Sequence, residues 1–577
     1  MKRPIGRRSL ANVEFPGDRG RPTQVHGTSR RSFLKLTTAI PGTFGTTMPV
    51  VAAPLHRLWW FNAALQGEAL AGEQVVRLPE SEPISLDPGV TRGNKGLEQM
   101  QNLFEGLVYL DQRDGSLQMG LAEAMDPNAD NSEFEFTLRD GMTWSDGKPL
   151  NAHDFEWSWK RAIDPAAGND YAFALFPIKN GVAVLQGVAE PDELGVRAID
   201  DRTLTVTLEG PTPYFPLLAS IWSYYPVPRH VVEAEGIDWT EAGKIVSNGP
   251  YMLTSWEHDQ SMVFERNPRY YGQPPIITKA TYTLFADDAS QALVPYENDE
   301  LDQAQVSFVD FDRVKNDSTL SAQMHVFPRS ATRFVVCDTM NAPTSDVRVR
   351  QALSLSIDRQ TLANEILGGV FSPAQTVLPP DIPGYNPAVA LGEDATRGQQ
   401  LLAEAGFPSG QGFPELSLVF HADDFAERTT AEYLQAAWMS ALGINVSLDP
   451  MEESAYQDWF QSRADQPFNL YIYQFGSDWK DPANWHNQLF DSRSDFYHSH
   501  WKNDEFDQTV REAAVMPDAV ARIARYVQAE SILVADAPVI PLYNLNRIYV
   551  VKPNIRGVFH NPILGRTWIR YISVTER

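Results

Sequence analysis

The chain has 577 residues, of which 43 % are hydrophobic, and its formal net charge is −26. Residues 1–52 contain nine Lys or Arg and two Asp or Glu, so the remaining 525 residues carry a net charge of −33. A surface this acidic repels nucleic acid and anionic lipid, which excludes both as partners. The length predicts two to four folding units. Cys337 is the only cysteine, so an internal disulfide and a Cys-rich zinc site are excluded, and we expect a buried core residue.

Residues 29–35 read Ser-Arg-Arg-Ser-Phe-Leu-Lys and resemble the twin-arginine export signal at every position of its usual pattern. The mildly apolar segment 36–55 follows, which suits a signal peptide better than a transmembrane helix. We therefore expect residues 1–52 to be a twin-arginine signal peptide with an N-terminal extension. A basic amphipathic helix is the alternative. This signal is an address and not an anchor, and with no cysteine near the cleavage site we expect no lipid anchor.

The first half of the mature chain mixes strand and helix patterns. Asn151 and Asp154 can cap a helix that carries Phe155, Trp157, Trp159 and Ile163. In chain order, we expect a strand at 74–87, a helix at 97–109, strands at 134–138 and 203–208, and a hairpin at 250–266 with its tip at 258–260.

From about residue 340 helical patterns dominate, with short strands between them. We expect helices at 346–367, 394–406, 427–442, 453–463, 504–515 and 518–534, and strands at 416–421, 444–449, 469–475 and 539–551. Such alternation favours an α/β unit with a largely parallel sheet. The predicted fold class of the whole chain is α/β (α+β).

The sequence contains none of the common catalytic motifs. GxSxG, HExxH, the P-loop and a GxGxxG that opens a helix are all missing. His486, His498 and His500 come nearest to a metal cluster, but we interpret them as residues of polar loops. We therefore expect no catalytic residue, no metal site and no cofactor, and a protein that is not an enzyme.

Motifs along the chain resemble a known family, and they occur in that family's order and spacing. They are residues 102–107 (Asn-Leu-Phe-Glu-Gly-Leu), 143–149 (Thr-Trp-Ser-Asp-Gly-Lys-Pro), 247–251 (Ser-Asn-Gly-Pro-Tyr) with 265–271, and 346–353 (Asp-Val-Arg-Val-Arg-Gln-Ala-Leu) with 357–359. Together they resemble the oligopeptide/dipeptide-binding family of ABC importers, the family 5 extracellular solute-binding proteins. The residues themselves are interpreted as scaffold: Asp146-Gly147 suits a tight turn and Asn248-Gly249-Pro250 a bend into a strand.

The resemblance implies a two-lobed periplasmic-binding-protein-like fold with a hinge and an extra subdomain on the first lobe. The expected division is lobe I at 74–117, 225–324 and 541–577, its subdomain at 118–224, and lobe II at 325–540. In such a protein the ligand is enclosed between two closing lobes, and it shifts the equilibrium through contacts that exist only in the closed form.

The same resemblance implies a set of ligand-binding residues. Asp478 stands where the family holds a peptide α-ammonium, which needs a carboxylate partner when it is buried. The other positions that match are Phe475 and Gly476 on a strand that pairs with the peptide backbone, Gly93 and Asn94 opposite it, Tyr456 beside a side-chain pocket, and Arg463 at the peptide carboxylate. The family's other basic positions fall on Ile472, on Asn341 and near Ala426, so recognition of the carboxylate is expected to be weaker or placed elsewhere.

The expected function is a periplasmic solute-binding subunit, a monomer, that captures oligopeptides and delivers them to an ABC transporter permease in the inner membrane. One alternative is a non-peptide solute, such as an oligosaccharide, an opine or a metal chelate, because fold does not fix the ligand. The other is an enzyme exported by the twin-arginine route.

Overall fold

The computed structural model describes residues 68–90, 95–286, 289–462, 468–494, 500–563 and 567–576. The predicted signal peptide at 1–52 lies outside these ranges. Within them, no helix is both long enough and apolar enough to cross a bilayer.

The first sheet has the strand order β1-β10-β9-β8, formed by β1 (Val75–Ser81), β10 (Lys279–Phe285), β9 (Ser261–Arg266) and β8 (Tyr251–Glu257). β1 and β10 are parallel and the other pairs are antiparallel. β8 and β9 form the predicted hairpin, and Asp259 at its tip adopts a φ of 60°.

Helix α2 (Leu97–Leu103) is shorter than the predicted helix at 97–109. The side chain of Asn248 explains where it ends. Its Oδ1 accepts the backbone N–H of Glu105 at 3.0 Å, and its Nδ2 donates to the carbonyl of Glu105 at 2.9 Å. The chain then enters β2 (Val108–Leu110). A motif predicted to be scaffold therefore terminates the helix.

A second sheet is antiparallel, with the order β4-β5-β7-β6, formed by β4 (Ala122–Pro127), β5 (Glu133–Leu138), β7 (Thr203–Thr207) and β6 (Val196–Ala198). Helix α3 (Ala152–Ile163) begins with a capping box of Asn151 and Asp154, as predicted. Phe155, Trp159 and Ile163 of this helix are buried, and Trp157 is partly exposed.

The largest sheet has the order β11-β17-β12-β16-β14-β15, formed by β11 (Gln303–Gln305), β17 (Val539–Val551), β12 (Met324–Cys337), β16 (Leu470–Gly476), β14 (Leu416–His421) and β15 (Val446–Met451). β14 is parallel to β15 and β16, whereas β12 is antiparallel to both of its neighbours. The prediction of a largely parallel sheet is therefore wrong, because β12 and β17 pair with each other as long antiparallel strands.

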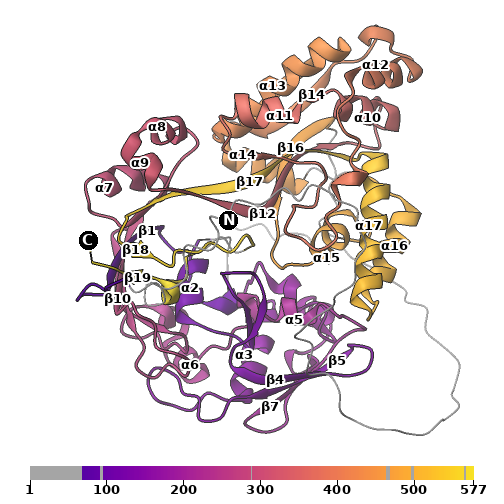
Figure 1. Ribbon diagram of the computed structural model, residues 1–577. Coiled ribbons are helices and arrows are strands. Elements are labelled where there is room, and N and C mark those ends of the chain that lie inside the picture. The colour runs from indigo at the N-terminus through magenta and orange to yellow at the C-terminus, as the bar shows by residue number, and fades with distance from the viewer. Residues whose placement is uncertain are drawn as a thin grey trace, which may run out of the picture. The chain divides into compact units, whose positions relative to one another are not determined.

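Helices cover both faces of this sheet, and Figure 1 shows α10, α12 and α13 gathered on one side of β16. Val335 and Cys337 of β12 pack on that side, whereas Phe334 and Val336 pack toward the other. One layer contains α10 (Val347–Leu355), α12 (Ala395–Glu404) and α13 (Phe425–Leu442), and the other contains α14 (Glu453–Ser462), α15 (Ala483–Trp485), α16 (Asp504–Ala514) and α17 (Ala519–Asp536). Cys337 is buried as predicted, and burial raises the pKa of its thiol to about 12.

The predicted helix at 346–367 is interrupted. α10 ends at Leu355, and Asp358 then caps the short helix α11 (Arg359–Thr361), which continues into a π-helical turn at Leu362–Ile366. The α-helices and strands not yet named are short: α4 (Gly181–Leu185), α5 (Phe215–Leu218), α6 (Arg229–Glu235), α7 (Leu293–Glu297), α8 (Phe311–Asn316), α9 (Ser318–Ala322), β3 (Leu117–Met119), β13 (Ser372–Pro373), β18 (Ile555–Arg556) and β19 (Ser573–Val574). The predicted fold class, α/β (α+β), is confirmed.

Candidate functional site

One edge of strand β16 is open. β12 pairs with the whole strand, from Leu470 to Gly476, whereas β14 pairs with it only at Leu470 and Tyr471. Among the described residues no strand pairs with the rest of that edge, from Tyr473 onward. An open edge offers main-chain donors and acceptors to an extended ligand.

The loop that follows β16 is held in place by buried polar contacts. The backbone N–H of Asp478 donates to Oδ1 of Asn484 at 2.7 Å, and Nδ2 of Asn484 donates to Gln488 at 2.6 Å. The indole N–H of Trp485 donates to the hydroxyl of Ser477 at 2.8 Å. These bonds fix the backbone from which the carboxylate of Asp478 projects.

The carboxylate of Asp478 has no cationic partner among the described residues. Burial raises its pKa to about 7, and the side chain of Asn484 offsets this only in part. No charged group contributes to the shift. A carboxylate in this environment is poised to pair with a cation that arrives from outside.

Asp478 lines a cavity of about 390 Å³ that extends along the end of β16. Its charged side chains are Asp170, Asp478, Arg329 and Arg547. The other lining residues are Leu97, Gln101, Tyr171, Phe173, Trp222, Tyr473, Gln474, Phe475, Gly476, Ser477, Gln488 and Ile563. Residues from α2 and from β16 thus face one another across it.

A larger cavity of about 670 Å³ shares Arg329 and Arg547 with the first. Part of its wall is aromatic. Phe308 stacks on Phe371 with ring centroids 6.3 Å apart, and Phe425 lies 5.7 Å from Phe308. Its other charged residues are Glu80, Lys95, Glu98, Arg333, Asp423 and Asp424.

A third cavity, of about 530 Å³, lies beside Tyr456. The ring of Tyr456 lies against that of His421, with centroids 3.6 Å apart and the planes tilted by 34°, and its hydroxyl donates to the carbonyl of Ile472 at 3.0 Å. Burial lowers the pKa of His421, but its contacts with Glu427 and other carboxylates outweigh this and raise it. The wall is acidic, because Asp423 and Glu453 also line it.

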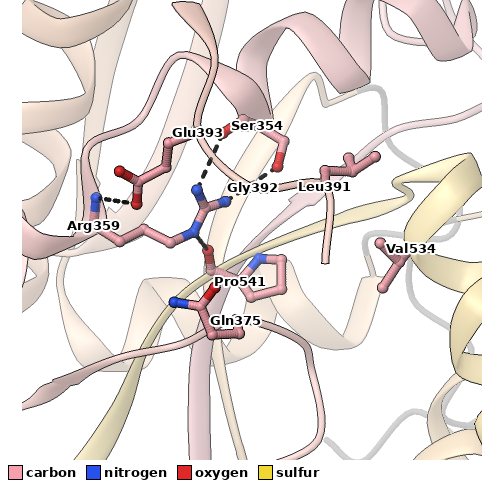
Figure 2. Close-up of a pocket in the computed structure, with 8 residues that line it drawn as sticks. All are labelled: Ser354, Arg359, Gln375, Leu391, Gly392, Glu393, Val534 and Pro541. Atoms are coloured by element: carbon pink, nitrogen blue, oxygen red, sulfur yellow. Dashed lines mark hydrogen bonds between the residues drawn. The ribbon is translucent and has the colours of Figure 1, made fainter. Parts of the chain in front are cut away.

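The buried Arg359, from the motif at 357–359, lies beside a small cavity that the exposed Gly392 and Glu393 also line (Figure 2). Its guanidinium donates to the carbonyl of Pro541 at 2.7 Å and to the hydroxyl of Ser354 at 3.1 Å. The cavity measures about 20 Å³, which is room for one water molecule. This motif is therefore structural, as the sequence analysis expected.

The structure brings together some of the residues that the resemblance singled out. Asp478, Phe475 and Gly476 line the 390 Å³ cavity, and Tyr456 lines the 530 Å³ cavity. Phe475 is 8 % exposed and packs edge-on against Trp485. The remaining predictions, Gly93, Asn94 and Arg463, lie outside the described residues.

The positions that lack the family's basic groups are used for other contacts. Ile472 is completely buried between the sheet and its helices. Asn341 donates to the carboxylate of Asp338 at 2.5 Å. Ala426 lines the 670 Å³ cavity but carries no polar group.

Arg329 and Arg547, which line the 390 Å³ cavity, were not predicted from the sequence. The segment around each arginine has an ordinary strand pattern, and the two residues lie 218 positions apart in the chain. Their only local signal is an arginine within a strand that is otherwise mostly apolar.

The histidines considered for a metal site have other partners. Nε2 of His486 lies 2.7 Å from the buried carboxylate of Glu530. Nδ1 of His500 lies 3.2 Å from Asp338, and His498 is outside the described residues. The described part of the chain holds no group of three side chains arranged to bind a metal ion.

Residues 116–497 match the sequence model of the bacterial extracellular solute-binding proteins, family 5. A probable deoxycholate-binding periplasmic protein of Escherichia coli K12 is 32 % identical over 503 residues, which cover 85 % of this chain and 92 % of that protein. The periplasmic oligopeptide-binding protein of the same organism is 31 % identical over 548 residues, 91 % of this chain and 98 % of that one. The unliganded open form of a periplasmic murein tripeptide-binding protein superposes with a TM-score of 0.76 at 28 % identity, covering 88 % and 99 % of the two chains.

Proposed function

The chain belongs to family 5 of the bacterial extracellular solute-binding proteins, and from this premise we propose that it is a periplasmic subunit of an ABC importer that captures peptides by their amino end. One observation carries the proposal. Asp478 is a carboxylate without a cationic partner among the described residues, and it lines a cavity next to the open edge of β16.

Each group of this site matches a part of a peptide. The α-ammonium would pair with Asp478, and the main chain would add to β16 as an extra strand beside Phe475 and Gly476. Arg463, Gly93 and Asn94 are proposed as further contacts on the strength of the resemblance alone. Bonds to the main chain hold a peptide whatever its side chains are, which suits a carrier of mixed peptides.

Calorimetry with a tripeptide and its N-acetylated form tests this proposal. Removing the ammonium leaves the partly buried carboxylate of Asp478 without a partner, so we expect acetylation to weaken binding by roughly 30-fold or more. Asp478→Ala is expected to lose most of the affinity for the free tripeptide. Unchanged affinity in either comparison would contradict the assignment of Asp478.

A second candidate is a non-peptide solute. The similarity to a probable deoxycholate-binding protein, together with the aromatic wall at Phe308, Phe371 and Phe425, favours it. Native mass spectrometry of freshly purified protein separates the two, because binding proteins often retain their ligand. A series of peptide masses supports the first proposal, and one non-peptide mass supports a bile-acid-like, oligosaccharide, opine or metal-chelate ligand.

The relatives are binding proteins, which makes an exported enzyme the weakest of the alternatives. Metal analysis and an absorption spectrum of the purified protein check it. A stoichiometric metal or chromophore would support an enzyme.

We also propose export through the twin-arginine route, because residues 29–35 match its signal. Replacing Arg30 and Arg31 by Lys should leave the precursor in the cytoplasm, which fractionation of cells measures.

The proposed mature protein is a monomer that docks on an inner-membrane permease, and it is divided into lobe I, its subdomain at 118–224, and lobe II at 325–540. Light scattering checks the monomer, and limited proteolysis checks the boundaries.

A further inference from the structure

The 390 Å³ cavity lies between two apolar cores. The first core is built from residues of the segments 76–284 and 549–574. The second core is built from residues of the segment 334–539 and packs under α15, α16 and α17. Leu97, which belongs to the first core, and Phe475, which belongs to the second, both line the cavity. A ligand in the cavity therefore contacts both parts of the chain.

Each core receives one aromatic side chain from the other part. Trp479, in the loop after β16, is 6 % exposed and packs in the first core. Among the described apolar residues between 338 and 538 it is the only one that does so. Tyr214, at the start of α5, is its counterpart, because it alone of the described apolar residues between 68 and 322 packs against the second core. The two parts thus exchange one aromatic residue each.

The ring of Tyr214 also meets a buried charge of the second part. The guanidinium carbon of Arg522 lies 5.1 Å from the ring centre of Tyr214 and 5.0 Å from that of Tyr526. Arg522 is held in turn by hydrogen bonds of 2.6 and 2.7 Å to the carboxylate of Asp481. A cation beside an aromatic ring is attracted to it, most strongly where water is excluded. This contact ties the start of α5 to the loop after β16.

The same loop carries Asp478, and one acceptor fixes both Asp478 and Trp479. Oδ1 of Asn484 accepts the backbone N–H of Asp478 at 2.7 Å and that of Trp479 at 3.4 Å. The backbone N–H of Asp481 donates to the carbonyl of Trp479 at 2.9 Å and closes the turn. A displacement of Asp478 is therefore passed on to Trp479.

Lys480 adds a third contact with the first part. Its Nζ lies 2.9 Å, and its Cδ 3.6 Å, from the point that a Cβ on Gly115 would occupy, in the turn between β2 and β3. In the described part of the chain, no hydrogen bond between backbone atoms joins residues 477–482 to residues 68–322. Contacts that are made by side chains alone can separate and form again without breaking a sheet.

Tyr214, Trp479 and Lys480 line none of the three cavities of the candidate site. We propose that Trp479 and Tyr214 are positioning residues that form a reciprocal latch, the pair of aromatic side chains exchanged between the two cores, and that this latch sets the affinity for the ligand without touching it. The inference rests on the proposed function, because it takes Asp478 as the ligand contact. Loss of the latch lowers the fraction of the protein that is competent to bind, and the apparent affinity falls by the same factor for every ligand.

Calorimetry of Tyr214→Leu with tri-alanine and with tri-leucine tests the proposal. We expect both peptides to bind more weakly by the same factor, roughly 2- to 30-fold, so that the ratio of their affinities stays at the wild-type value. Trp479→Phe keeps an apolar ring and should cause a smaller loss in the same direction. Tyr385→Leu is the matched control, since Tyr385 is also half-buried and packs against the second core alone.

Two further measurements respond to a latch and not to a general loss of packing. In stopped-flow experiments the dissociation rate of tri-alanine from Tyr214→Leu should rise in proportion to the loss of affinity, because the latch holds the ligand-bound form together. In X-ray scattering without a peptide, Tyr214→Leu should have a larger radius of gyration than the wild type and Tyr385→Leu.

The outcomes separate the latch from the proposed function. Equal radii of gyration for Tyr214→Leu and the wild type would overturn the latch, and so would an unchanged affinity for tri-alanine or an equal loss of affinity in Tyr385→Leu. The scattering comparison needs no ligand, so it decides on the latch even if no peptide binds, and in that case the proposed function fails by itself. If Tyr214→Leu does not fold, Trp479→Phe decides the same comparisons.

Discussion

The backbone N–H of Asp478 donates a 2.7 Å hydrogen bond to Oδ1 of Asn484, a residue six positions later that is itself completely buried. This bond holds the loop in one conformation, yet it adds no positive charge near the carboxylate. The binding proposal and the cost of this site to stability both follow from that arrangement.

Asp478→Asn is expected to stabilise the ligand-free protein at pH 8 while it removes peptide binding. The pKa of Asp478 is about 7 in the fold, above its ordinary value, so its contribution to stability is present at low pH and is lost as the pH rises through 7. Asparagine does not titrate. The amount by which the free energy of unfolding of Asp478→Asn exceeds that of the wild type should therefore grow between pH 5 and pH 8. The growth is up to about 3 kcal/mol, at about 1.4 kcal/mol per pH unit below the pKa of Asp478.

Urea unfolding of both proteins at the two pH values measures this advantage. Asp504→Asn changes a carboxylate that is 91 % exposed and serves as the control for the substitution itself. An advantage of the same size at pH 5 and pH 8 would show that Asp478 is already ionised throughout this range.

Tyr456→Phe is expected to lower the free energy of unfolding by about 1–3 kcal/mol. The change removes the buried 3.0 Å hydrogen bond to the carbonyl of Ile472, while the ring can still lie against His421. Tyr385→Phe is the control, since the hydroxyl of Tyr385 bonds to no described group. Equal midpoints in urea for both variants would contradict the role given to the hydroxyl.

Gly249→Ala should destabilise the fold, typically by about 1–3 kcal/mol. A Cβ at this position would lie 2.6 Å from the backbone carbon and oxygen of Leu103, at the end of α2, and backbone atoms cannot move aside easily. Gly210→Ala meets nothing within 4 Å and should be close to neutral. Thermal unfolding of the pair makes the comparison, and a neutral Gly249→Ala would mean that the bend after Asn248 can relax.

Arg522→Met is expected to cost about 3–5 kcal/mol, because it leaves the carboxylate of Asp481 buried without its partner. The two side chains form two hydrogen bonds of 2.6 and 2.7 Å and each is 7 % exposed. Adding Asp481→Asn should recover part of the loss. Arg397→Met, on the surface of α12, should change the free energy of unfolding by less than about 0.5 kcal/mol. A double variant as unstable as Arg522→Met alone would locate the cost in lost packing.

Helices and strands whose limits are set by their own residues were predicted well from the sequence. β17 spans 539–551 as its strand pattern indicates, and α3 begins at the capping residues Asn151 and Asp154. Boundaries set by distant residues were not predicted. α2 ends early because of Asn248, which lies far along the chain and is not visible in the helical pattern at 97–109.

The residues of the candidate site also fall into those that a local pattern predicted and those that it did not. Asp478, Gly476 and Phe475 follow one another on a single strand and loop, so a local resemblance was enough to single them out. Arg329 and Arg547 come together only through the register of β12 and β17, which no local pattern encodes. The direction of the strands escaped prediction for the same reason, since an apolar run indicates a strand but not the orientation of its partner.

Cys337 gives the protein a practical advantage for measurements of motion. It is the only cysteine, it is completely buried, and the raised pKa keeps its thiol protonated at neutral pH. Because the thiolate is the reactive form, maleimide dyes and thiol-specific spin labels should not react with Cys337 in the native protein. Cysteines introduced in pairs on exposed helices can therefore be labelled without removing the native residue, and the distance between two labels would report directly on how the protein moves when a ligand is added.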